Sequence, residues 1–435
     1  MSDIKLQSVP VTDTRIEESA YSKVTWRLIP FLFICYILCW LDRVNVGFAK
    51  LQMQQQLGFS DTVYGLGAGI FFISYFIFEI PSNLLLEKVG PRRWIGRIMI
   101  TWGVVSALTM FVNSATSFYV LRFLLGFMEA GFFPGIILYL TYWYPASRRA
   151  HITALFLTAI PVCGFVGAPV SGWILDTFSG VSGLGGWQWL FLLEGLPCII
   201  LGVVTLWYLS DSIADSTWLT ESEKKVLQHY IELDKKGKTR HSLKDGLIDW
   251  RVWVLGFVYF CIVAGLYGYN FWLPQMIKST GIKSAFYIGL LIAIPNAVAV
   301  VGMIWAGRSS DRHLERRWHL FTCGVVAGIG LALSAAFASS TMFAVLAATV
   351  GIVGIMATLS IYWSVPTQLL AGTAAAGGIA LINSLGNLSG FVAPSMLGYI
   401  KDATKSLSGG LYALAALVVI GVILIVIITP RPTTK

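Results

Sequence analysis

The stretch Asn83-Leu-Leu-Leu-Glu87-Lys-Val-Gly-Pro-Arg92-Arg93 joins two long apolar segments, and the stretch Gly307-Arg-Ser-Ser-Asp311-Arg-His-Leu-Glu-Arg316-Arg317 joins two others much later. The acids Glu87 and Asp311 lie 224 positions apart. A second motif also occurs twice, as Gly167-Ala-Pro169-Val-Ser-Gly-Trp-Ile-Leu-Asp176 and as Val392-Ala-Pro394-Ser-Met-Leu-Gly-Tyr-Ile-Lys-Asp402, with its prolines 225 positions apart. Two independent repeats at nearly one offset predict two homologous halves.

The composition indicates an integral membrane protein. Of the 435 residues, 56% are hydrophobic and only 12% are charged, whereas a globular domain is about 25% charged. The apolar runs are about 20 residues long, which is enough to span a bilayer as a helix. We therefore expect an all-α membrane protein with twelve transmembrane helices in two pseudo-symmetric six-helix bundles. The expected spans are 26–48, 61–86, 94–112, 117–143, 151–175, 188–209, 252–276, 285–306, 319–338, 341–364, 375–400 and 410–429.

The placement of the positive charges predicts the topology. Of the 31 Lys and Arg residues, 24 fall in segments that lie on one side of the predicted membrane, and five on the other. By the positive-inside rule both termini are cytoplasmic, in the inner or plasma membrane, and the net charge of +9 does not indicate nucleic acid. The predicted parts are a tail (1–25), an N-terminal bundle (26–210), a central loop (211–250), a C-terminal bundle (251–429) and a short tail (430–435).

The central loop contains a helix start signal. Thr220 precedes Glu223 by three residues, which is the spacing of a capping box, and a short amphipathic helix over about 220–234 should follow. We interpret the loop as a linker between the two bundles that rests on the anionic inner leaflet.

Several motifs together resemble the major facilitator superfamily, beginning with the paired loops, Arg122-Phe-Leu-Leu-Gly126 and Gly164-Phe-Val-Gly167-Ala-Pro169. Within that superfamily, Leu41-Asp42-Arg43-Val-Asn45-Val-Gly-Phe-Ala49 and Glu129-Ala-Gly-Phe-Phe-Pro134-Gly are similar to signatures of the anion:cation symporter family. Two further stretches resemble the branch that carries tartrate, aldonic acids, phthalate and hydroxyphenylacetate. They are Trp187-Gln-Trp-Leu-Phe-Leu-Leu-Glu194-Gly and Pro366-Thr-Gln-Leu-Leu-Ala-Gly-Thr-Ala. One departure is Asn83, because the loop motif usually starts with glycine.

Charged side chains within the predicted membrane segments are functional candidates, because each costs at least about 2.5–3.5 kcal/mol to insert. Arg122 and Glu129 are two helical turns apart and share a face. The resemblance implies that the first and fourth helices line the cavity, so we expect two carboxylates and two guanidiniums around one space. We expect Arg43 to bind a substrate carboxylate through its planar fork, Asp42 and Glu129 to carry protons, and Arg122 to balance Glu129 or contact the anion. Static salt bridges between the two helices are the alternative.

Other polar groups within apolar runs are weaker candidates. Tyr75, Asn383 and Asn387 are predicted to contact substrate, and the apolar stretch Ile160-Pro-Val162 would form an apolar wall if it faces the cavity. For Glu79, before Pro81, we favour a structural role in satisfying freed backbone groups. In the paired loops, ion pairs between helices are predicted to hold the transporter closed on the cytoplasmic side. The alternative is that the arginines only keep these loops on the cytoplasmic side of the membrane. The residues of this predicted gate are Glu87, Arg92, Arg93, Asp311, Arg316 and Arg317.

The sequence therefore predicts a secondary transporter that takes up a small organic anion with protons by alternating access. An anion exchanger or facilitative carrier of the same fold is the nearest alternative, and drug efflux, a transporter-like sensor and a membrane enzyme are weaker ones. No metal cluster, phosphate loop or nucleophile–base set is visible in the sequence, so we expect no enzyme activity and no cofactor, with the proton gradient as the energy source. A monomer in the lipid bilayer is the default for this architecture.

Overall fold

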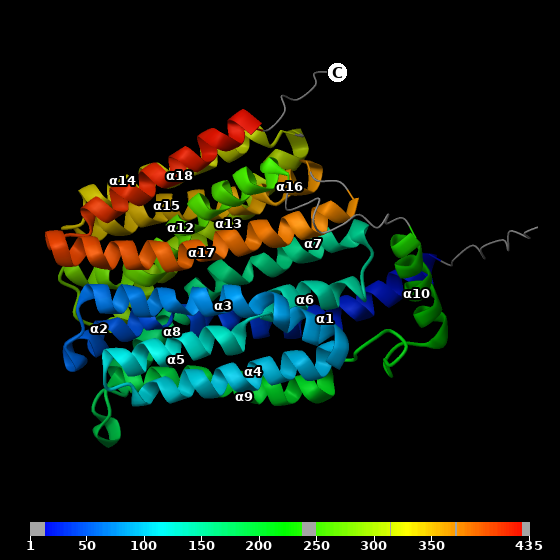
Figure 1. The fold of residues 1–435 in the computed structure, drawn as a ribbon, viewed down its shortest axis with the longest axis horizontal. Helices are drawn as coiled ribbons and strands as arrows, with labels where there is room; N and C mark the ends of the chain where they lie inside the picture. The colour runs from blue at the N-terminus through cyan, green and yellow to red at the C-terminus, as the bar shows by residue number, and fades with distance from the viewer. Residues whose placement is uncertain (1–13, 237–248, 314, 370–371, 429–435) are drawn as a thin grey trace, which may run out of the picture.

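The computed structural model describes residues 14–236, 249–313, 315–369 and 372–428, and within these ranges it is helical, without strands (Figure 1). The helices are α1 (Thr14–Val44), α2 (Val46–Leu57), α3 (Asp61–Val89), α4 (Pro91–Leu108), α5 (Ala115–Glu129), α6 (Phe132–Thr141), α7 (Ala146–Leu157), α8 (Ala159–Thr177), α9 (Gly186–Tyr208), α10 (Glu221–Lys236), α12 (Trp250–Ser279), α13 (Ala285–His313), α14 (Arg317–Ala336), α15 (Thr341–Tyr362), α16 (Ser364–Leu369), α17 (Gly372–Thr404) and α18 (Ser408–Ile428), with short 3₁₀ turns η1 (Thr109–Phe111) and η2 (Val181–Gly183).

The membrane segments follow the apolar runs of the sequence. Among the described residues, eleven helical stretches are long and apolar enough to cross a bilayer, and α17, of 33 residues, runs lengthwise beside α3 and α12. The first predicted span was too short, because α1 begins at Thr14 and the helical stretch continues through α2 to Leu57. The predicted fourth and fifth spans are each divided into two helices, at 130–131 and at Thr158.

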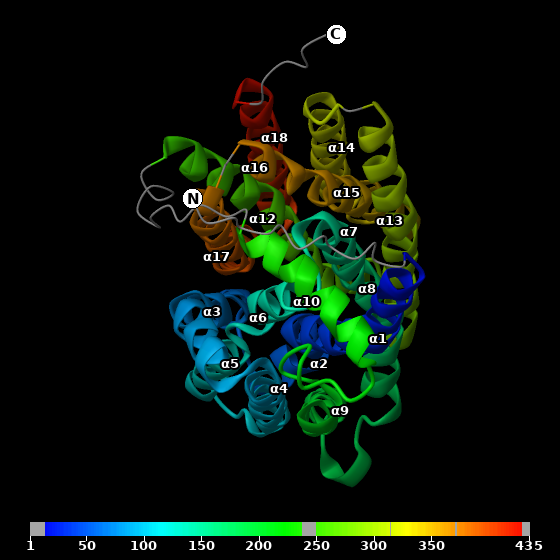
Figure 2. The ribbon, with the colours of Figure 1, turned by 90° about the vertical axis from the view of Figure 1, so that its right-hand side faces the viewer.

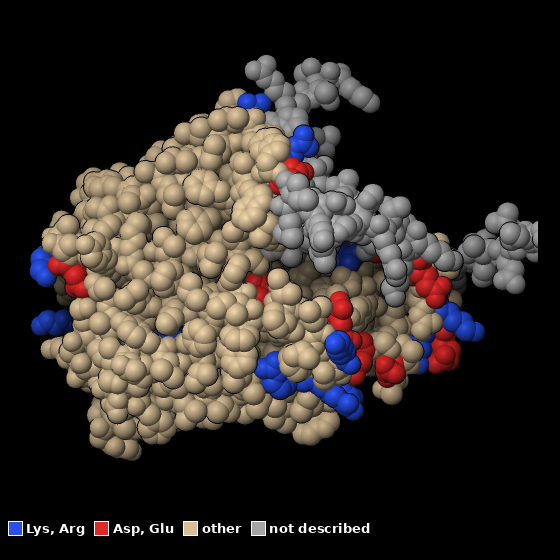
Figure 3. Space-filling model, in the orientation of Figure 1, with Lys and Arg blue, Asp and Glu red and all other residues tan. Residues whose placement is uncertain are grey.

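The helices form two groups that lie side by side. Figures 1 and 2 show α1 to α9 on one side and α12 to α18 on the other, with α3 packed along α17 and α8 along α13. Both ends of the described chain lie at one end of the bundle, which we call the tail end, and the opposite end is called the far end. On the face drawn in Figure 3, charged side chains gather mostly at these two ends. An uncharged band between charged ends is what a bilayer requires.

At the far end the two halves are joined by reciprocal helix caps. Asp176, at the end of α8, accepts hydrogen bonds from the backbone N–H groups of Ala285 and Phe286 at 3.0 and 2.9 Å. Asp402, at the end of α17, accepts from the backbone of Asp61 and Thr62 at 3.2 and 2.7 Å. Each carboxylate therefore caps the first turn of a helix in the other half, where the positive end of the helix dipole favours an anion.

Close backbone packing accompanies these caps. A Cβ atom added at Gly65 of α3 would overlap the carbonyl oxygen of Pro394 on α17. Across the second seam, a Cβ at Gly289 of α13 would overlap the carbonyl oxygen of Ala168 on α8. The residues of the repeated Pro169 and Pro394 motifs thus form the two seams at which the halves meet.

At the tail end, α10 docks on the first turns of α1. The predicted capping box is confirmed: Thr220 N–H donates to Glu223 Oε2 at 2.9 Å, and Glu223 N–H donates to Thr220 Oγ1 at 3.4 Å. Glu223 also pairs with Lys23 at 2.8 Å and accepts from Ser19 Oγ at 3.0 Å. The helix in the central loop is therefore attached to the N-terminal half, through the segment 14–25 that the sequence analysis treated as a tail.

Candidate functional site

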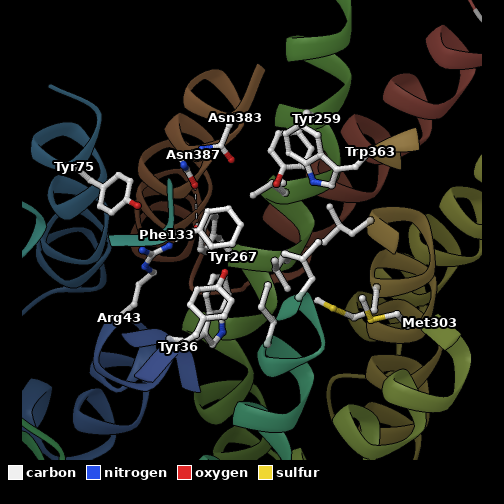
Figure 4. A pocket seen from close by; sticks show the side chains of 17 residues that line it. Tyr36, Arg43, Tyr75, Phe133, Tyr259, Tyr267, Met303, Trp363, Asn383 and Asn387 are labelled. Atoms are coloured by element: carbon white, nitrogen blue, oxygen red, sulfur yellow. Dashed lines mark hydrogen bonds between the residues drawn. The ribbon is translucent and has the colours of Figure 1, made fainter. Parts of the chain in front are cut away.

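A cavity of about 60 Å³ lies between the two halves and is lined by side chains from both (Figure 4). Arg43 contributes the charge, and the rest of the lining is aromatic, amide or aliphatic. The lining residues are Tyr36, Trp40, Arg43, Tyr75, Phe133, Leu157, Ile160, Tyr259, Val263, Leu266, Tyr267, Met303, Met356, Leu359, Trp363, Asn383 and Asn387. The structure thus places Arg43, Tyr75, Asn383, Asn387 and the apolar Ile160 where the sequence predicted them.

Arg43 is held at the end of α1. α1 ends at Val44 and α2 begins at Val46, but Asn45 between them keeps helical φ and ψ angles, so Arg43 lies within a nearly continuous helical stretch. The side chain is 4% exposed, and aromatic rings surround the guanidinium, including Tyr75 at 5.0 Å and Trp40 at 5.3 Å from the ring centres. Such rings stabilise a cation that is withdrawn from water.

Glu129 is the counter-ion of Arg43. Arg43 Nη2 forms a short ion pair with Glu129 Oε1, and Arg43 Nε donates to the same oxygen at 3.1 Å. The thiol of Cys39 also donates to Oε1, at 3.2 Å. Glu129 is fully buried, and the described residues provide no hydrogen-bond donor to its second oxygen, Oε2. One carboxylate oxygen therefore carries all the contacts, and Arg43 supplies the balancing charge.

The backbone break that follows Glu129 depends on glycine. Helix α5 ends at Glu129, Ala130 is non-helical, and Gly131 adopts φ +87° before α6 begins at Phe132. A side chain disfavours this left-handed conformation, and a Cβ at Gly131 would also overlap the hydroxyl of Ser82. Because the helix is interrupted after Glu129, this carboxylate lies at the end of α5 and not in the middle of a continuous helix.

Hydrogen bonds connect Glu129 to the other half through the cavity. Arg43 Nη1 donates to the hydroxyl of Tyr267 on α12 at 3.4 Å, and that hydroxyl donates to Asn387 Oδ1 on α17 at 3.5 Å. Figure 4 shows these side chains converging from separate helices. This chain of hydrogen bonds, from Glu129 through Arg43 and Tyr267 to Asn387, crosses the interface between the halves. A ligand that binds Arg43 would therefore change contacts in both halves.

Glu79 forms a second polar contact between the halves. Its carboxylate accepts from Asn383 Nδ2 at 3.1 Å and from Ser384 Oγ at 3.3 Å, both on α17. Its partners are therefore side chains of the other half. They are not the backbone groups freed by Pro81 that were expected from the sequence. A single sequence gives no sign of this contact, because the two residues of each pair are more than 300 positions apart.

Asp42 and Arg122 do not line the cavity, so the four charges do not surround one space. Asp42 points away from Arg43 into the N-terminal half, where it accepts from Ser106 Oγ at 2.8 Å, Trp102 Nε1 at 3.0 Å and Cys198 Sγ at 3.0 Å. Adjacent residues on a helix diverge by roughly 100°, which explains the separation. Arg122 donates to backbone oxygens at 3.3–3.4 Å, one of them the carbonyl of Arg43.

The predicted gate residues form different pairs in the two halves. In the C-terminal half, Arg316 pairs with Asp311 at 2.5 Å. In the N-terminal half, Arg92 contacts Asp211 instead of Glu87, through its backbone N–H at 2.9 Å and its Nε at 3.9 Å. Glu87 is exposed. Both ion pairs lie within one half, so they do not join the halves in this conformation.

The aromatic wall of the cavity was not predicted from the sequence. It is formed by side chains that were not proposed as site residues, namely Tyr36, Trp40, Phe133, Tyr259 and Trp363. Other aromatic residues of the chain are exposed, such as Trp26, or buried in the core, such as Trp102. No local signal distinguishes these positions, because the distinction depends on which helices are neighbours.

Comparisons with known proteins agree with this architecture. Residues 32–394 match the sequence profile of the Major Facilitator Superfamily. The chain is 50% identical over 420 residues to a putative tartrate transporter of Agrobacterium vitis, covering 96% of this chain and 93% of that protein. It is 39% identical to a quinolone resistance transporter of Acinetobacter baumannii, covering 95% of each. Among solved structures, a partially occluded inward-open xylose transporter from E. coli superposes with a TM-score of 0.73 at 12% identity, covering 94% of this chain and 99% of that one.

Proposed function

This chain belongs to the major facilitator superfamily and is a multi-pass membrane transporter, and we propose that it takes up a small organic anion together with protons. The observation that supports this proposal is the buried Arg43 in the wall of a cavity between the halves. A guanidinium remains charged when it is withdrawn from water and matches a carboxylate with two parallel hydrogen bonds. The relative named for tartrate, a dicarboxylate, fits such an anchor.

The pairing of Arg43 with Glu129 suggests how anion and proton are coupled. A substrate carboxylate that engages Arg43 competes with Glu129 for the same fork. Glu129 would then be buried without its counter-ion, and breaking a buried pair in this way costs about 3–5 kcal/mol. Proton uptake by Glu129 removes that cost, so anion binding and proton binding favour each other. Asp42 is our second proton candidate, acting from a neighbouring face of α1 that points into the N-terminal half.

The reciprocal caps suggest the step of the cycle that the structure represents. We propose that the tail end is cytoplasmic, in the inner or plasma membrane, and that the halves are closed at the far, external end. Trp40 lines both the central cavity and a second cavity of about 40 Å³ on its far-end side, and its ring stacks on Tyr267 at 5.9 Å. In this proposal the stack separates the substrate site from the external side.

The experiment is uptake into proteoliposomes with an imposed inward proton gradient. The substrates are tartrate, gluconate, phthalate and hydroxyphenylacetate, and the proteins are wild type, Glu129→Gln and, as an exposed control, Glu221→Gln. The proposal expects one of these anions to accumulate against its gradient in wild type and control, and no accumulation in Glu129→Gln. Equal uptake with and without the proton gradient would contradict symport and support an exchanger or facilitative carrier.

A further inference from the structure

A hydrogen-bond acceptor on the cavity wall is fixed by a residue outside the cavity. Asn383 lines the cavity, whereas Glu79, which binds its amide, does not. A side-chain amide offers an NH₂ donor on one side and a carbonyl acceptor on the other. Which of the two faces the cavity decides which substrate group can bind there.

The contacts of Glu79 determine the orientation of the amide. One carboxylate oxygen accepts from Asn383 Nδ2 at 3.1 Å, and the other accepts from Ser384 Oγ at 3.3 Å. Both carboxyl oxygens of Glu79 act as acceptors here, so the NH₂ group of Asn383 faces Glu79 and its Oδ1 lies on the other side. Figure 4 shows the Asn383 oxygen turned toward Tyr259 and the cavity. Among the described residues, no side chain donates to this oxygen.

The neighbouring amide has the opposite orientation. Asn387 is one turn further along α17, and its Oδ1 accepts from the hydroxyl of Tyr267. Its NH₂ group is therefore the part left for a ligand. An acceptor on Asn383 and a donor on Asn387, at i and i+4 of one helix, match a hydroxyl group, which both donates and accepts.

We propose that Glu79 is a positioning residue that orients the Asn383 amide and thereby selects anions that carry a hydroxyl group beside the carboxylate bound by Arg43. This inference rests on the proposed function and specifies its substrate class. A deoxy acid leaves Asn383 Oδ1 without a donor in a partly buried wall. A lost neutral hydrogen bond of this kind lowers affinity by up to about tenfold. Glu79 itself does not touch the substrate.

The test compares two acids of equal charge and similar size, tartrate and succinate, as substrates in proteoliposomes. The measured quantity is the ratio of their kcat/KM values. Glu79→Met removes the acceptor at nearly unchanged side-chain length, and it should lower the tartrate preference about tenfold while leaving the KM for succinate unchanged. Glu79→Gln keeps an acceptor oxygen and should retain part of the preference. Ser384→Ala removes the other hydrogen bond of Glu79 and should leave the ratio unchanged.

Asn383→Leu provides a second route if Glu79→Met does not fold, because it removes the acceptor itself and should also abolish the preference. An equal fall in Glu79→Met and Ser384→Ala would show that these contacts only join the halves, and it would overturn the inference. Equal kcat/KM values of the wild type for succinate and tartrate would also overturn the inference. The proposed function would still stand in that case. If wild type transports neither these two acids nor the other anions named above, the proposed function fails and this inference fails with it.

Discussion

Asp176 and Asp402 end the two copies of the Pro169 and Pro394 motif, seven and eight residues after the proline, and each caps a helix of the opposite half. Asp176 lies at the end of α8 and caps α13, whereas Asp402 lies at the end of α17 and caps α3. The internal repeat of the sequence is therefore also the symmetry of the far-end closure. The repeated motif therefore joins the two halves at the far end both by packing and by capping.

Removing either cap should shift the carrier toward a conformation that is open at the far end. We expect Asp402→Asn or Asp176→Asn, which removes the negative charge at the helix N-terminus, to weaken the closed form by about 0.3–1 kcal/mol, which is about two- to fivefold in the population ratio. Spin labels at Gln55 and Ala403, exposed positions on the two halves, would report this as longer distances. Asp215→Asn at the tail end is the control. Unchanged distances in both cap variants would contradict the assignment.

Arg43→Lys tests whether the fork, and not only the charge, binds the anion. Lysine keeps the positive charge near Glu129 but cannot form two parallel hydrogen bonds. We expect KM for the transported anion to rise about tenfold or more, since hydrogen bonds to charged groups contribute about 1.5–3 kcal/mol. Initial-rate uptake measures this, and the melting temperature shows that folding is preserved. An unchanged KM would rule out bidentate binding.

Gly131→Ala tests the backbone break next to Glu129. The substitution forces a side chain into φ +87° and against Ser82, so it should destabilise the protein by about 2–4 kcal/mol. Gly180 is a matched control, because its φ is +85° but nothing lies within 4 Å of an added Cβ. Gly180→Ala should therefore cost only the conformational part, about 1–2 kcal/mol. Equal thermal shifts for the two variants would show that the contact with Ser82 is unimportant.

The fold was largely predictable because hydrophobic length determines it. The apolar runs are local features and indicated helices that cross a membrane, and the two repeated motifs indicated two halves. Helix breaks were harder to predict. The helix break after Glu129 depends on Gly131, which lies within an apolar stretch. The residues around Gly131 do not distinguish it from glycines that lie inside a continuous helix.

The candidate site was only partly predictable, because its contacts join distant segments. Arg43 and Glu129 were identified as rare intramembrane charges, and the structure brings them together. Asp42 was assigned to the same space, but helical geometry turns it toward Trp102 and Ser106. The pairing of Glu79 with Asn383 depends on how α3 packs against α17, which no single-sequence pattern contains.

The docking of α10 on α1 makes a prediction about pH. Burial raises the pKa of Glu223, but hydrogen bonds from Lys23, the Thr220 backbone and Ser19 outweigh it and lower the pKa from 4.5 to about 2. A carboxyl group with a lowered pKa stabilises the docked state fully above its ordinary value of 4.5. This contribution declines as the pH falls below 4.5 and is lost below about 2. We therefore expect docking to be constant from pH 7 to about 5 and to weaken progressively in more acidic solution.

Spin labels at the exposed positions Glu18 on α1 and Lys225 on α10 would follow the distance between the two helices across this pH range. Glu223→Gln mimics the protonated acid and should weaken docking at pH 7, whereas the exposed Glu221→Gln should not. Glu17 and Asp234 also pair with arginines of α7 and add to the docking. The contribution of Glu223 is therefore the difference between wild type and Glu223→Gln. A difference that already disappears between pH 7 and pH 5 would show that Glu223 is not held ionised by these contacts.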